Sequence, residues 1–419
     1  MSLPDATILP PQRERLLLLT LGAIQFIHIM DFMIMMPLGS SLMRVFGISP
    51  GQFSLLVAAY GLSAAISGFV GGFFLDRFDR RSALLVLFTG FGLATLACAL
   101  SPNYHTLLIA RFAAGAFGGV AGSVVTAMVG DAIPAERRGR AMGMVMAAYP
   151  LASILGIPLG LFLAGWLGWH APFFLLSLLC VSILTIAFKT LPHVTSHRSL
   201  AHPVRQMIEL MTHRVHLRGF LLTASLIFSG AIVVPFMAPS MVANVGLDER
   251  HQLPLVYMLG GACTFFTMPW FGRLADRYDK VQVLIAISLV AVPAMLMTTR
   301  LGPGPLYTTF LTTTLFFIGM SGRFAPTMAL ITNAVAARYR GGFMSVNSAV
   351  QQAAGALANI VAGLIIVQGP NGRLLNYAKV GWLSFAAFGC TIALAFWLRK
   401  AAPHAARNAI PMPPAEPAT

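Results

Sequence analysis

Long apolar stretches separated by short polar breaks dominate this chain. Many of them contain no Lys, Arg, Asp or Glu, among them residues 51–75, 82–110, 141–188, 219–247, 281–299, 341–372 and 380–398. A helix needs about 20 apolar residues to cross a bilayer, and Gly, Pro and polar positions divide the longer stretches. We predict about twelve spans, near residues 15–40, 51–75, 82–101, 105–131, 139–166, 171–190, 218–244, 251–273, 281–299, 304–335, 341–368 and 377–399. They are predicted to be helices, because backbone groups in lipid must be satisfied within one segment or in a closed barrel, and the alternating barrel pattern is absent.

A short charged motif occurs twice, with 200 residues between the copies, each time between two apolar stretches. The copies contain Gly72, Asp76, Arg77, Arg80 and Arg81, and then Gly272, Asp276, Arg277 and Lys280. Residues 137–140 before the fifth span are likewise echoed by residues 338–341 before the eleventh. Such matching halves indicate duplication, which is common in transporters. The predicted fold class is an all-α membrane protein with about 12 transmembrane helices in two pseudo-symmetric six-helix halves.

The predicted organisation consists of two tails, two halves and a linker. In chain order these are residues 1–14, a cytoplasmic tail; 15–190, the first half; 191–217, a cytoplasmic linker; 218–400, the second half; and 401–419, a second tail. The linker is rich in His and Arg, and 203–213 has the pattern of a short amphipathic helix at an anionic membrane surface. The Pro/Ala-rich second tail is predicted to be disordered.

The composition agrees with a membrane protein, since 57% of the residues are hydrophobic and only 10% are charged. The formal charge of +15 suggests nucleic acid as a partner, but the placement of the charges argues against it. If the N-terminus is inside, only five basic residues fall in the outer loops: Arg44, Arg250, Arg300, Arg373 and Lys379. Because positive residues concentrate on the cytoplasmic side, both termini are predicted to be cytoplasmic. The membrane is then the plasma membrane, or the inner membrane of a Gram-negative cell.

The chain resembles the major facilitator superfamily over essentially residues 12–400. The superfamily's loop pattern G-x-x-x-D-R-x-G-R-R fits the first copy of the repeat, although Asp79, and Asp279 in the second copy, replace the usual second glycine. Its span-four pattern R-x-x-x-G-x-x-G fits Arg111, Gly115 and Gly118. The resemblance implies transport by alternating access of the two halves, usually as a monomer.

The fifth span carries an approximate version of the superfamily's antiporter pattern, in which glycines surround a proline. Gly156, Pro158 and Gly160 match it without the usual adjacent Gly-Pro. This variant is similar to that of the drug-efflux and sugar-efflux proton antiporters, which favours export.

The repeated loops are predicted to form a gate. Asp76 and Asp276 fit the N-terminus of a neighbouring helix, where free N–H groups and the helix dipole favour an anion. The resemblance places the starts of spans five and eleven nearby, so these contacts would form when the cytoplasmic side closes. Asp131 is a further candidate partner for the arginines of the first loop. The alternative is that both loops are solvated turns that follow the positive-inside rule.

Asp31 is the only one of thirteen acidic residues well inside a span. Burying a carboxylate at membrane depth costs roughly 2.5–3.5 kcal/mol on insertion scales and favours its protonated form. A carboxyl group that gains and loses a proton is what a proton-coupled carrier needs. Gln25 and His28 precede it at three-residue steps on roughly the same face. These three residues are predicted to line the substrate cavity, with Asp31 as the proton site; the alternative is a structural carboxylate paired permanently with an arginine.

Two arginines also lie within spans. Arg111 is at a depth similar to that of Asp31 and is its candidate partner, unless it only caps helix carbonyls. Arg323 is near the middle of the tenth span, where a guanidinium needs an anion, backbone carbonyls or cavity water. Two deep arginines against one aspartate predict a positive cavity for anionic or zwitterionic substrates. A purely structural Arg323 is the alternative.

The sequence thus predicts a secondary active transporter that exports small molecules in exchange for protons. The alternative is a proton-coupled symporter or facilitator of an organic anion or metabolite. A more remote alternative is a membrane sensor that transports nothing. No nucleophile–base arrangement and no phosphate-binding loop point to an enzyme or a primary pump. The predicted partners are a small-molecule substrate, protons and the bilayer, with no nucleic acid, no cofactor and no metal.

Overall fold

The computed structural model describes residues 10–74, 78–192 and 209–406, without the side chains of residues 72–74, 135, 136 and 337. These residues contain 12 helical segments that are apolar and long enough to cross a membrane, as the sequence predicted. Nine segments are single helices: α1 (Pro11–Ile34), α3 (Pro50–Phe74), α4 (Arg80–Ala99), α5 (Tyr104–Ala132), α9 (Ala171–Thr190), α13 (Gln252–Arg277), α14 (Lys280–Thr298), α17 (Arg340–Ile365) and α18 (Tyr377–Ala401).

The other three segments are interrupted. Segment five consists of α6 (Ala135–Met146), α7 (Ala148–Leu151), a π-helical turn (Ala152–Gly156) and α8 (Ile157–Leu167). Segment seven consists of α11 (Arg214–Ala231), α12 (Val234–Ser240) and a second π-helical turn (Met241–Val245). Segment ten consists of α15 (Leu306–Gly322) and α16 (Phe324–Ala334).

Prolines lie at most of the interruptions. Pro158 follows the first π-helical turn, Pro235 lies at the start of α12, and Pro326 lies in the first turn of α16. Pro37 lies in the turn between α1 and the short α2 (Gly39–Phe46). Proline has no N–H to donate and clashes with the carbonyl four residues earlier, so a helix bends or ends there.

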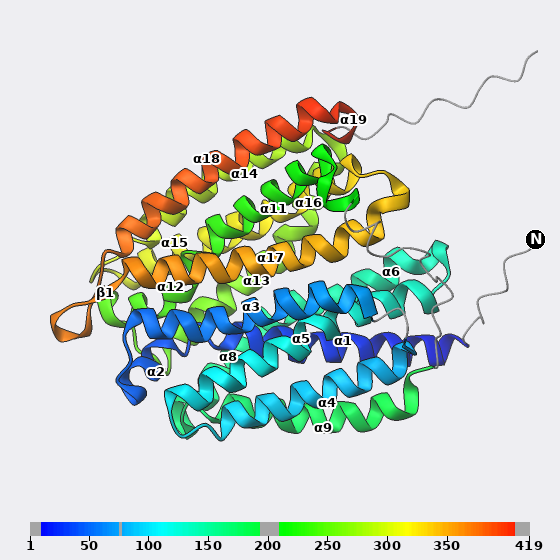
Figure 1. Ribbon diagram of the computed structural model, residues 1–419. Helices are drawn as coiled ribbons and strands as arrows, with labels where there is room; N and C mark the ends of the chain where they lie inside the picture. The colour runs from blue at the N-terminus through cyan, green and yellow to red at the C-terminus, as the bar shows by residue number, and fades with distance from the viewer. Residues whose placement is uncertain (1–9, 75–77, 193–208, 407–419) are drawn as a thin grey trace, which may run out of the picture.

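The two halves repeat the same packing (Figure 1). In the first half, α5 packs against α3 and α4, α4 packs against α9, and α1 packs against α9. In the second half, α15 packs against α13 and α14, α14 packs against α18, and α11 packs against α18. Between the halves, α3 lies along α17, and α13 contacts α8 with its π-helical turn. The internal repeat of the sequence is therefore also a repeat of packing.

The two ends of the bundle differ. Both described termini lie at one end, which we name the basic end after its residues Arg80, Arg137, Lys280 and Arg399 (Figure 1). The opposite end carries α2 and a small antiparallel hairpin of β1 (Val367–Gln368) and β2 (Leu374–Leu375).

Contacts between the halves are close at the opposite end. The hydroxyl group of Ser40 on α2 donates a hydrogen bond to Oε1 of Glu249 at 2.6 Å. The rings of Phe53 and Phe236 meet edge to face with 5.7 Å between centroids. A Cβ atom at Gly363 of α17 would lie only 1.9 Å from the hydroxyl oxygen of Ser54 on α3. The halves are thus closely packed at this end.

Three ion pairs between described residues of the basic end, in contrast, each join residues of one half. They are Glu14–Arg137 at 3.0 Å, Arg80–Asp131 at 3.3 Å and Asp279–Arg399 at 3.3 Å. These pairs stabilise each half without tying it to the other.

Asp79 and Asp279 cap the helices that follow the repeated loops. Oδ2 of Asp79 accepts a hydrogen bond from the backbone N–H of Ser82 at 3.0 Å, at the start of α4. Oδ1 of Asp279 accepts from the N–H of Val281 at 2.9 Å, at the start of α14. Aspartate is among the preferred N-cap residues because its carboxylate satisfies N–H groups that have no partner within the helix. The aspartates that replace a glycine of the family pattern therefore have a local structural role.

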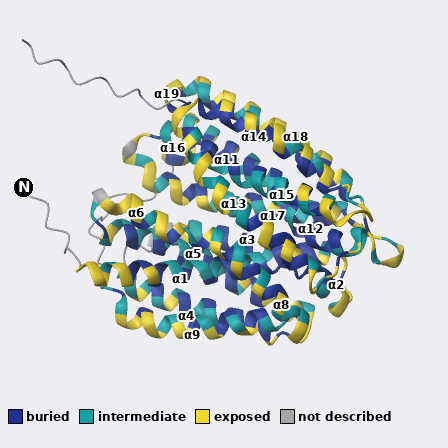
Figure 2. Cartoon of the chain, turned by 180° about the vertical axis from the view of Figure 1, so that it is seen from behind, coloured by how far each residue is buried: buried dark blue, intermediate teal, exposed yellow. Residues whose placement is uncertain are grey.

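Large apolar side chains are exposed around the outside of the bundle (Figure 2). Leu364 is 78% exposed and Phe266 is 74% exposed, while the interior contains a continuous apolar core. Extensive apolar exposure is unfavourable in water and matches the hydrocarbon of a bilayer. The chain is an integral membrane protein with several spans.

Two predictions concern the linker and the second tail. Residues 193–208 and 407–419 lie outside the described residues, so most of the predicted amphipathic helix and of the tail is not described. The first residues of that tail differ from the expected disorder, because α19 (Pro403–Ala406) is helical and packs on α16 and α18. Ala405 and Ala406 are almost completely buried there, which small apolar side chains allow.

Candidate transport site

Asp31 and Arg111 form an ion pair inside the first half. Asp31 lies on α1, which begins at the basic end, and Arg111 lies on α5, which runs in the opposite direction. Nη1 of Arg111 is 2.7 Å from Oδ2 of Asp31 and also donates to the backbone carbonyl of Asp31 at 3.3 Å. Both side chains are 0% exposed. The structure therefore pairs two residues that the sequence named as candidate partners because of their similar depth.

Tyr60 and Thr95 complete the surroundings of this pair, and the sequence had singled out neither. The ring of Tyr60 on α3 lies 4.7 Å from Cζ of Arg111, which is within cation–π distance. The hydroxyl group of Thr95 on α4 donates to Oδ1 of Asp31 at 3.4 Å. The pair is thus enclosed by four helices of one half.

Glycines of α5 allow α1 and α3 to come close to the pair. A Cβ atom at Gly115 would lie 2.2 Å from the backbone carbonyl oxygen of Tyr60. A Cβ atom at Gly118 would lie 2.5 Å from the hydroxyl oxygen of Tyr60 and 2.7 Å from Nε2 of His28. The span-four pattern therefore has a steric reason, because any larger residue would push α1 or α3 away.

His28 and Gln25 lie on α1 between Asp31 and the basic end. Both residues are partly exposed, whereas Asp31 is completely buried. The ring of His28 packs on Tyr60 and Phe91, with 5.9 and 5.7 Å between centroids. Both ring nitrogens of His28 and Oε1 of Gln25 are buried without a hydrogen-bond partner among the described residues. The structure thus places the predicted polar stripe beside the ion pair.

Arg323 lies in the second half, between α15 and α16, and is 1% exposed. Nη1 donates to the hydroxyl oxygen of Ser229 at 3.1 Å, and Nη2 lies 2.8 Å from the sulfur of Met320. Its Cζ lies 3.6 Å from the ring centroid of Phe388. Among the described residues no carboxylate lies within ion-pair distance of it, and its Nε has no hydrogen-bond partner. Arg323 is therefore a buried positive charge with neutral neighbours, separate from the Asp31–Arg111 pair.

The first copy of the predicted gate motif is only partly described. Gly72 lies in the last turn of α3, and Asp76 and Arg77 lie outside the described residues. Arg80 is almost completely buried and forms an ion pair with Asp131 of α5. This is one of the pairings that the sequence predicted. Arg81 donates to the backbone carbonyl oxygen of Phe188 at 2.5 Å. This loop therefore joins α4 to α5 and α9.

The second copy lies at the junction of α13 and α14. Gly272 is in α13 and has no neighbouring atom where a Cβ would lie. Asp276 and Arg277 are exposed in the last turn of α13, and Lys280 opens α14 with a buried side chain. Gly139 and Gly341, at the starts of the spans expected nearby, also face open space. The predicted gate stays a prediction.

The span-five residues pack against α1. A Cβ at Gly156 would lie 3.0 Å from the sulfur of Met30, and a Cβ at Gly160 would lie 2.6 Å from Cδ1 of Ile34. Pro158 is the second residue of α8, which begins where the π-helical turn ends. These residues thus support the helix that carries Asp31.

A contact at the opposite end was missed by the sequence reasoning. Glu249 receives a hydrogen bond from Ser40 and forms an ion pair with Arg44, both on α2 of the other half. Beside it, Asp248 accepts from the backbone N–H of Arg250 and contacts His251, and these two interactions lower the pKa of Asp248. No sequence signal links α2 to residue 249, because the contact depends on how the halves meet.

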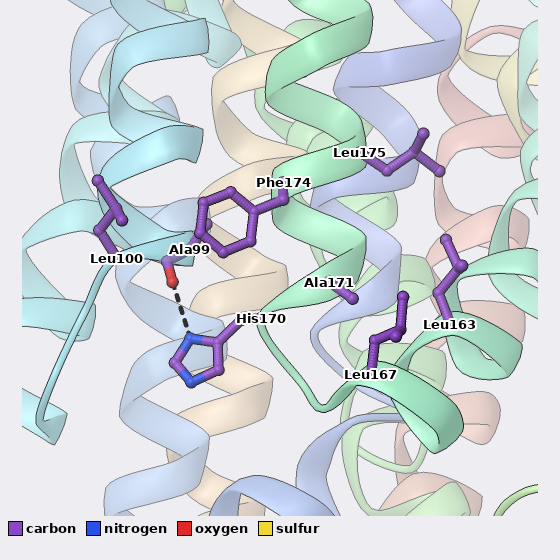
Figure 3. A pocket seen from close by; sticks show the side chains of 8 residues that line it. All are labelled: Ala99, Leu100, Leu163, Leu167, His170, Ala171, Phe174 and Leu175. Carbon is purple, nitrogen blue, oxygen red and sulfur yellow. Dashed lines mark hydrogen bonds between the residues drawn. The ribbon is translucent and has the colours of Figure 1, made fainter.

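A pocket on the outer surface lies apart from the deep charges (Figure 3). Apolar side chains of α4, α8 and α9 line it, including Leu100, Leu163 and Phe174. Nδ1 of His170 lies 2.7 Å from the backbone carbonyl oxygen of Ala99 at its rim. Its lining includes strongly exposed leucines, so it faces the bilayer. In the described part of the chain, no group of three His, Cys, Asp or Glu side chains is placed to hold a metal ion.

Two similar six-helix halves with deep charges define a multi-pass membrane protein of the transporter class, and not an enzyme. The chain belongs to the Major Facilitator Superfamily, whose sequence description matches residues 21–358 and 219–417. It is 25% identical over 354 residues to the "Uncharacterized MFS-type transporter YceJ" of Bacillus subtilis (strain 168). The alignment covers 82% of this chain and 87% of that relative.

Solved structures share the fold. A D-xylose-proton symporter superimposes with a TM-score of 0.74 at 19% identity, covering 94% of this chain and 98% of that one. A bacterial homologue of the human lysosomal transporter Spinster, in an inward-facing and unoccupied conformation, gives a TM-score of 0.71 at 16% identity, covering 94% and 97%. At such identities the likeness concerns the fold alone.

Proposed function

We propose that this protein exports small anionic or zwitterionic molecules in exchange for protons, by alternating access of its two halves. In this proposal the basic end and both termini face the cytoplasm, the membrane is the plasma membrane, and the protein works as a monomer. The observation that carries the proposal is the completely buried pair of Asp31 and Arg111.

Asp31 is the proposed proton site. A buried carboxylate is stable as an anion only while its partner is in place. Adding a proton to Asp31 removes the negative charge that holds Arg111, so the pair would loosen and α1 and α5 could change their packing. Because losing the ion pair changes the packing of α1 on α5, proton binding is coupled to a change of conformation.

Arg323 is the proposed recognition site for the negative charge of the substrate. The Asp31–Arg111 pair is neutral as a whole, so Arg323 supplies the remaining deep positive charge. A buried guanidinium is stabilised by charge-assisted hydrogen bonds to a carboxylate or phosphate. A substrate that carries such a group would give Arg323 the anion that its protein neighbours do not provide.

The contacts between the halves support alternating access. The halves are packed at the opposite end through Ser40 and Glu249, whereas the ion pairs Glu14–Arg137 and Arg80–Asp131, in the described part of the basic end, each lie within one half. This arrangement agrees with a state open towards the basic end. We propose that Asp76 and Asp276 contact the starts of α6 and α17 in the other state, and so close the basic end.

A symporter is the second candidate, because the D-xylose-proton symporter shares the fold. The span-five residues beside α1 favour export by their similarity to the efflux pattern. Transport in vesicles of known orientation decides the direction: a proton gradient that drives substrate out of right-side-out vesicles supports export, and accumulation inside them supports symport.

The first experiment is thermal unfolding of the purified protein with a panel of ligands that carry carboxylate, phosphate, amine or no charge. We expect carboxylates or phosphates to stabilise the wild type and to lose this effect in Arg323→Ala. Arg218→Ala is the matched control, because Arg218 also lies over an aromatic ring, that of Trp397 at 4.3 Å, but near the membrane surface. Stabilisation by lipophilic cations alone, lost in Asp31→Asn, would contradict an anionic substrate.

A further inference from the structure

A row of polar side chains leads from Asp31 towards the basic end. Asp31, His28 and Gln25 lie three residues apart on α1, which places them on roughly one face of the helix. Asp31 is completely buried, whereas His28 and Gln25 are partly exposed. As whole residues, the members of the row are therefore less buried towards the basic end.

The other direction along α1 is closed. The residues that follow Asp31 towards the opposite end include Ile34, Met35 and Leu38, which are 0%, 0% and 1% exposed. Apolar side chains packed in this way offer no hydrogen bonds for a proton to follow. Along α1, the polar side chains next to Asp31 therefore continue only towards the basic end, past His28.

Glycines of α5 face this row. Gly118 lies against Nε2 of His28. A Cβ atom at Gly122 would lie 3.9 Å from Cε1 of His28 and 3.7 Å from Oε1 of Gln25. The absence of side chains on this part of α5 leaves the ring nitrogen without an apolar cover.

Five polar atoms along the row are buried and have no hydrogen-bond partner among the described residues. They are Nη2 of Arg111, the hydroxyl oxygen of Tyr60, Nδ1 and Nε2 of His28, and Oε1 of Gln25. An unsatisfied buried polar group is unfavourable, and water is the usual partner of such groups when the site is polar. Five of them in one row describe a path that can hold water, not an apolar core.

The groups around His28 suit a neutral imidazole that accepts a proton briefly. On its own helix, Asp31 is the acidic neighbour. The element α5 presents Arg111, α3 presents the uncharged Tyr60, and α4 presents Phe91 and Thr95. The charged groups named on these elements are therefore one carboxylate and one guanidinium, which are already paired with each other.

We propose that His28 carries protons between Asp31 and the basic end. This inference rests on the proposed function, in which Asp31 is the proton site. In the release step, the carboxyl O–H of Asp31 breaks and its proton binds one ring nitrogen of His28, directly or through one water molecule. The other ring nitrogen gives its proton to water near Gln25, and the carboxylate of Asp31 returns to Arg111. His28 ends neutral, and one proton has moved towards the basic end.

The test is time-resolved infrared spectroscopy of the protein in nanodiscs after a pH jump, which needs no substrate. The carboxyl band that is present in the wild type and absent in Asp31→Asn is assigned to the protonated Asp31. We expect His28→Asn to slow the change of this band by about 10²-fold, the usual contribution of a positioned acid–base group, with its amplitude unchanged. Asparagine keeps the polarity of the site but cannot carry the proton.

Two further variants make the result decisive. Gly118→Ala keeps His28 but displaces its ring and that of Tyr60, because the new Cβ would lie 2.7 Å from Nε2 of His28 and 2.5 Å from the hydroxyl oxygen of Tyr60, and it should slow the band as well. His216→Asn, at a buried histidine of α11, is the matched control and should leave the rate unchanged. If His28→Asn does not fold, Gly118→Ala decides.

An unchanged rate in folded His28→Asn or in Gly118→Ala overturns the relay while leaving Asp31 as the proton site. If no carboxyl band is lost in Asp31→Asn, the proton site fails, and the relay fails with it. The two failures are thus distinguishable in one data set.

Discussion

Nη1 of Arg323 donates a hydrogen bond to the hydroxyl oxygen of Ser229 at 3.1 Å, at the place in the second half that corresponds to Asp31 in the first. Ser229 precedes Pro235 by six residues, as Asp31 precedes Pro37, and both prolines lie where the helix is interrupted. One half thus gives its buried arginine a carboxylate, and the other gives it only a hydroxyl group. The two halves share an architecture and differ in charge.

A carboxylate at position 229 should occupy the guanidinium of Arg323. We expect Ser229→Asp to remove stabilisation by anionic ligands as completely as Arg323→Ala does, because the new ion pair competes with the ligand. Ser229→Asn, which has a similar size and no charge, should retain most of the effect. Thermal unfolding with the same ligand panel measures both variants, and anion stabilisation that survives in Ser229→Asp would contradict the assignment.

The Asp31–Arg111 pair should behave as one energetic unit. Removing one partner of a buried ion pair leaves an uncompensated charge and costs about 3–5 kcal/mol. We expect Asp31→Asn and Arg111→Gln each to lower the free energy of unfolding by this amount. The double variant should recover more than half of the loss. Equilibrium unfolding in detergent gives the double-mutant cycle, and purely additive losses would show that the two side chains do not depend on each other.

The aspartate caps give a separate prediction about stability. Asp79→Ala should cost about 0.5–2 kcal/mol, because the N–H of Ser82 loses its acceptor. Asp79→Gly restores the residue usual in the family pattern. It should lower the free energy of unfolding by only about a few tenths of a kcal/mol. Asp279→Asn keeps a capping oxygen but loses the ion pair with Arg399, so it should be milder than Asp279→Ala. Equal losses for the alanine and glycine variants at position 79 would argue against capping.

Glu249 should hold the opposite end closed. Its ion pair with Arg44 is partly exposed, with 59% of the Arg44 side chain and 22% of the Glu249 side chain accessible, so it should contribute about 0.2–1 kcal/mol. We expect Glu249→Gln to raise the population open at this end by up to about fivefold. Spin labels at Val45 and Val367, both exposed, report the distance between α2 and β1 of the other half in a cysteine-free background. An unchanged distance distribution would mean that the apolar contacts alone close this end.

The sequence predicts the fold well because lipid allows few solutions. Twelve apolar segments must be helices, and the repeated loops indicate two halves. It also predicts that Asp31 and Arg111 lie at one depth, because a charge within a span is conspicuous. Their pairing follows from the packing of α1 on α5, which no local pattern encodes.

Other members of the site could not be found in this way. Residues that face lipid and residues that face the interior are both apolar in a membrane protein, so nothing in α3 marks Tyr60 as the ring beneath Arg111. Ser229 is equally inconspicuous. Asp79 and Asp279 did carry a usable signal, since an aspartate shortly before an apolar run is typical of a helix start.

The uneven charge of the two halves has an electrical consequence. With Asp31 and Arg111 neutralising each other, the deep part of the described chain carries one excess positive charge, on Arg323. Moving one elementary charge across the whole membrane field changes its free energy by about 2.3 kcal/mol for every 100 mV of membrane potential. Any movement of Arg323 across the field is therefore driven by voltage in the empty protein, and a bound monoanion cancels that force.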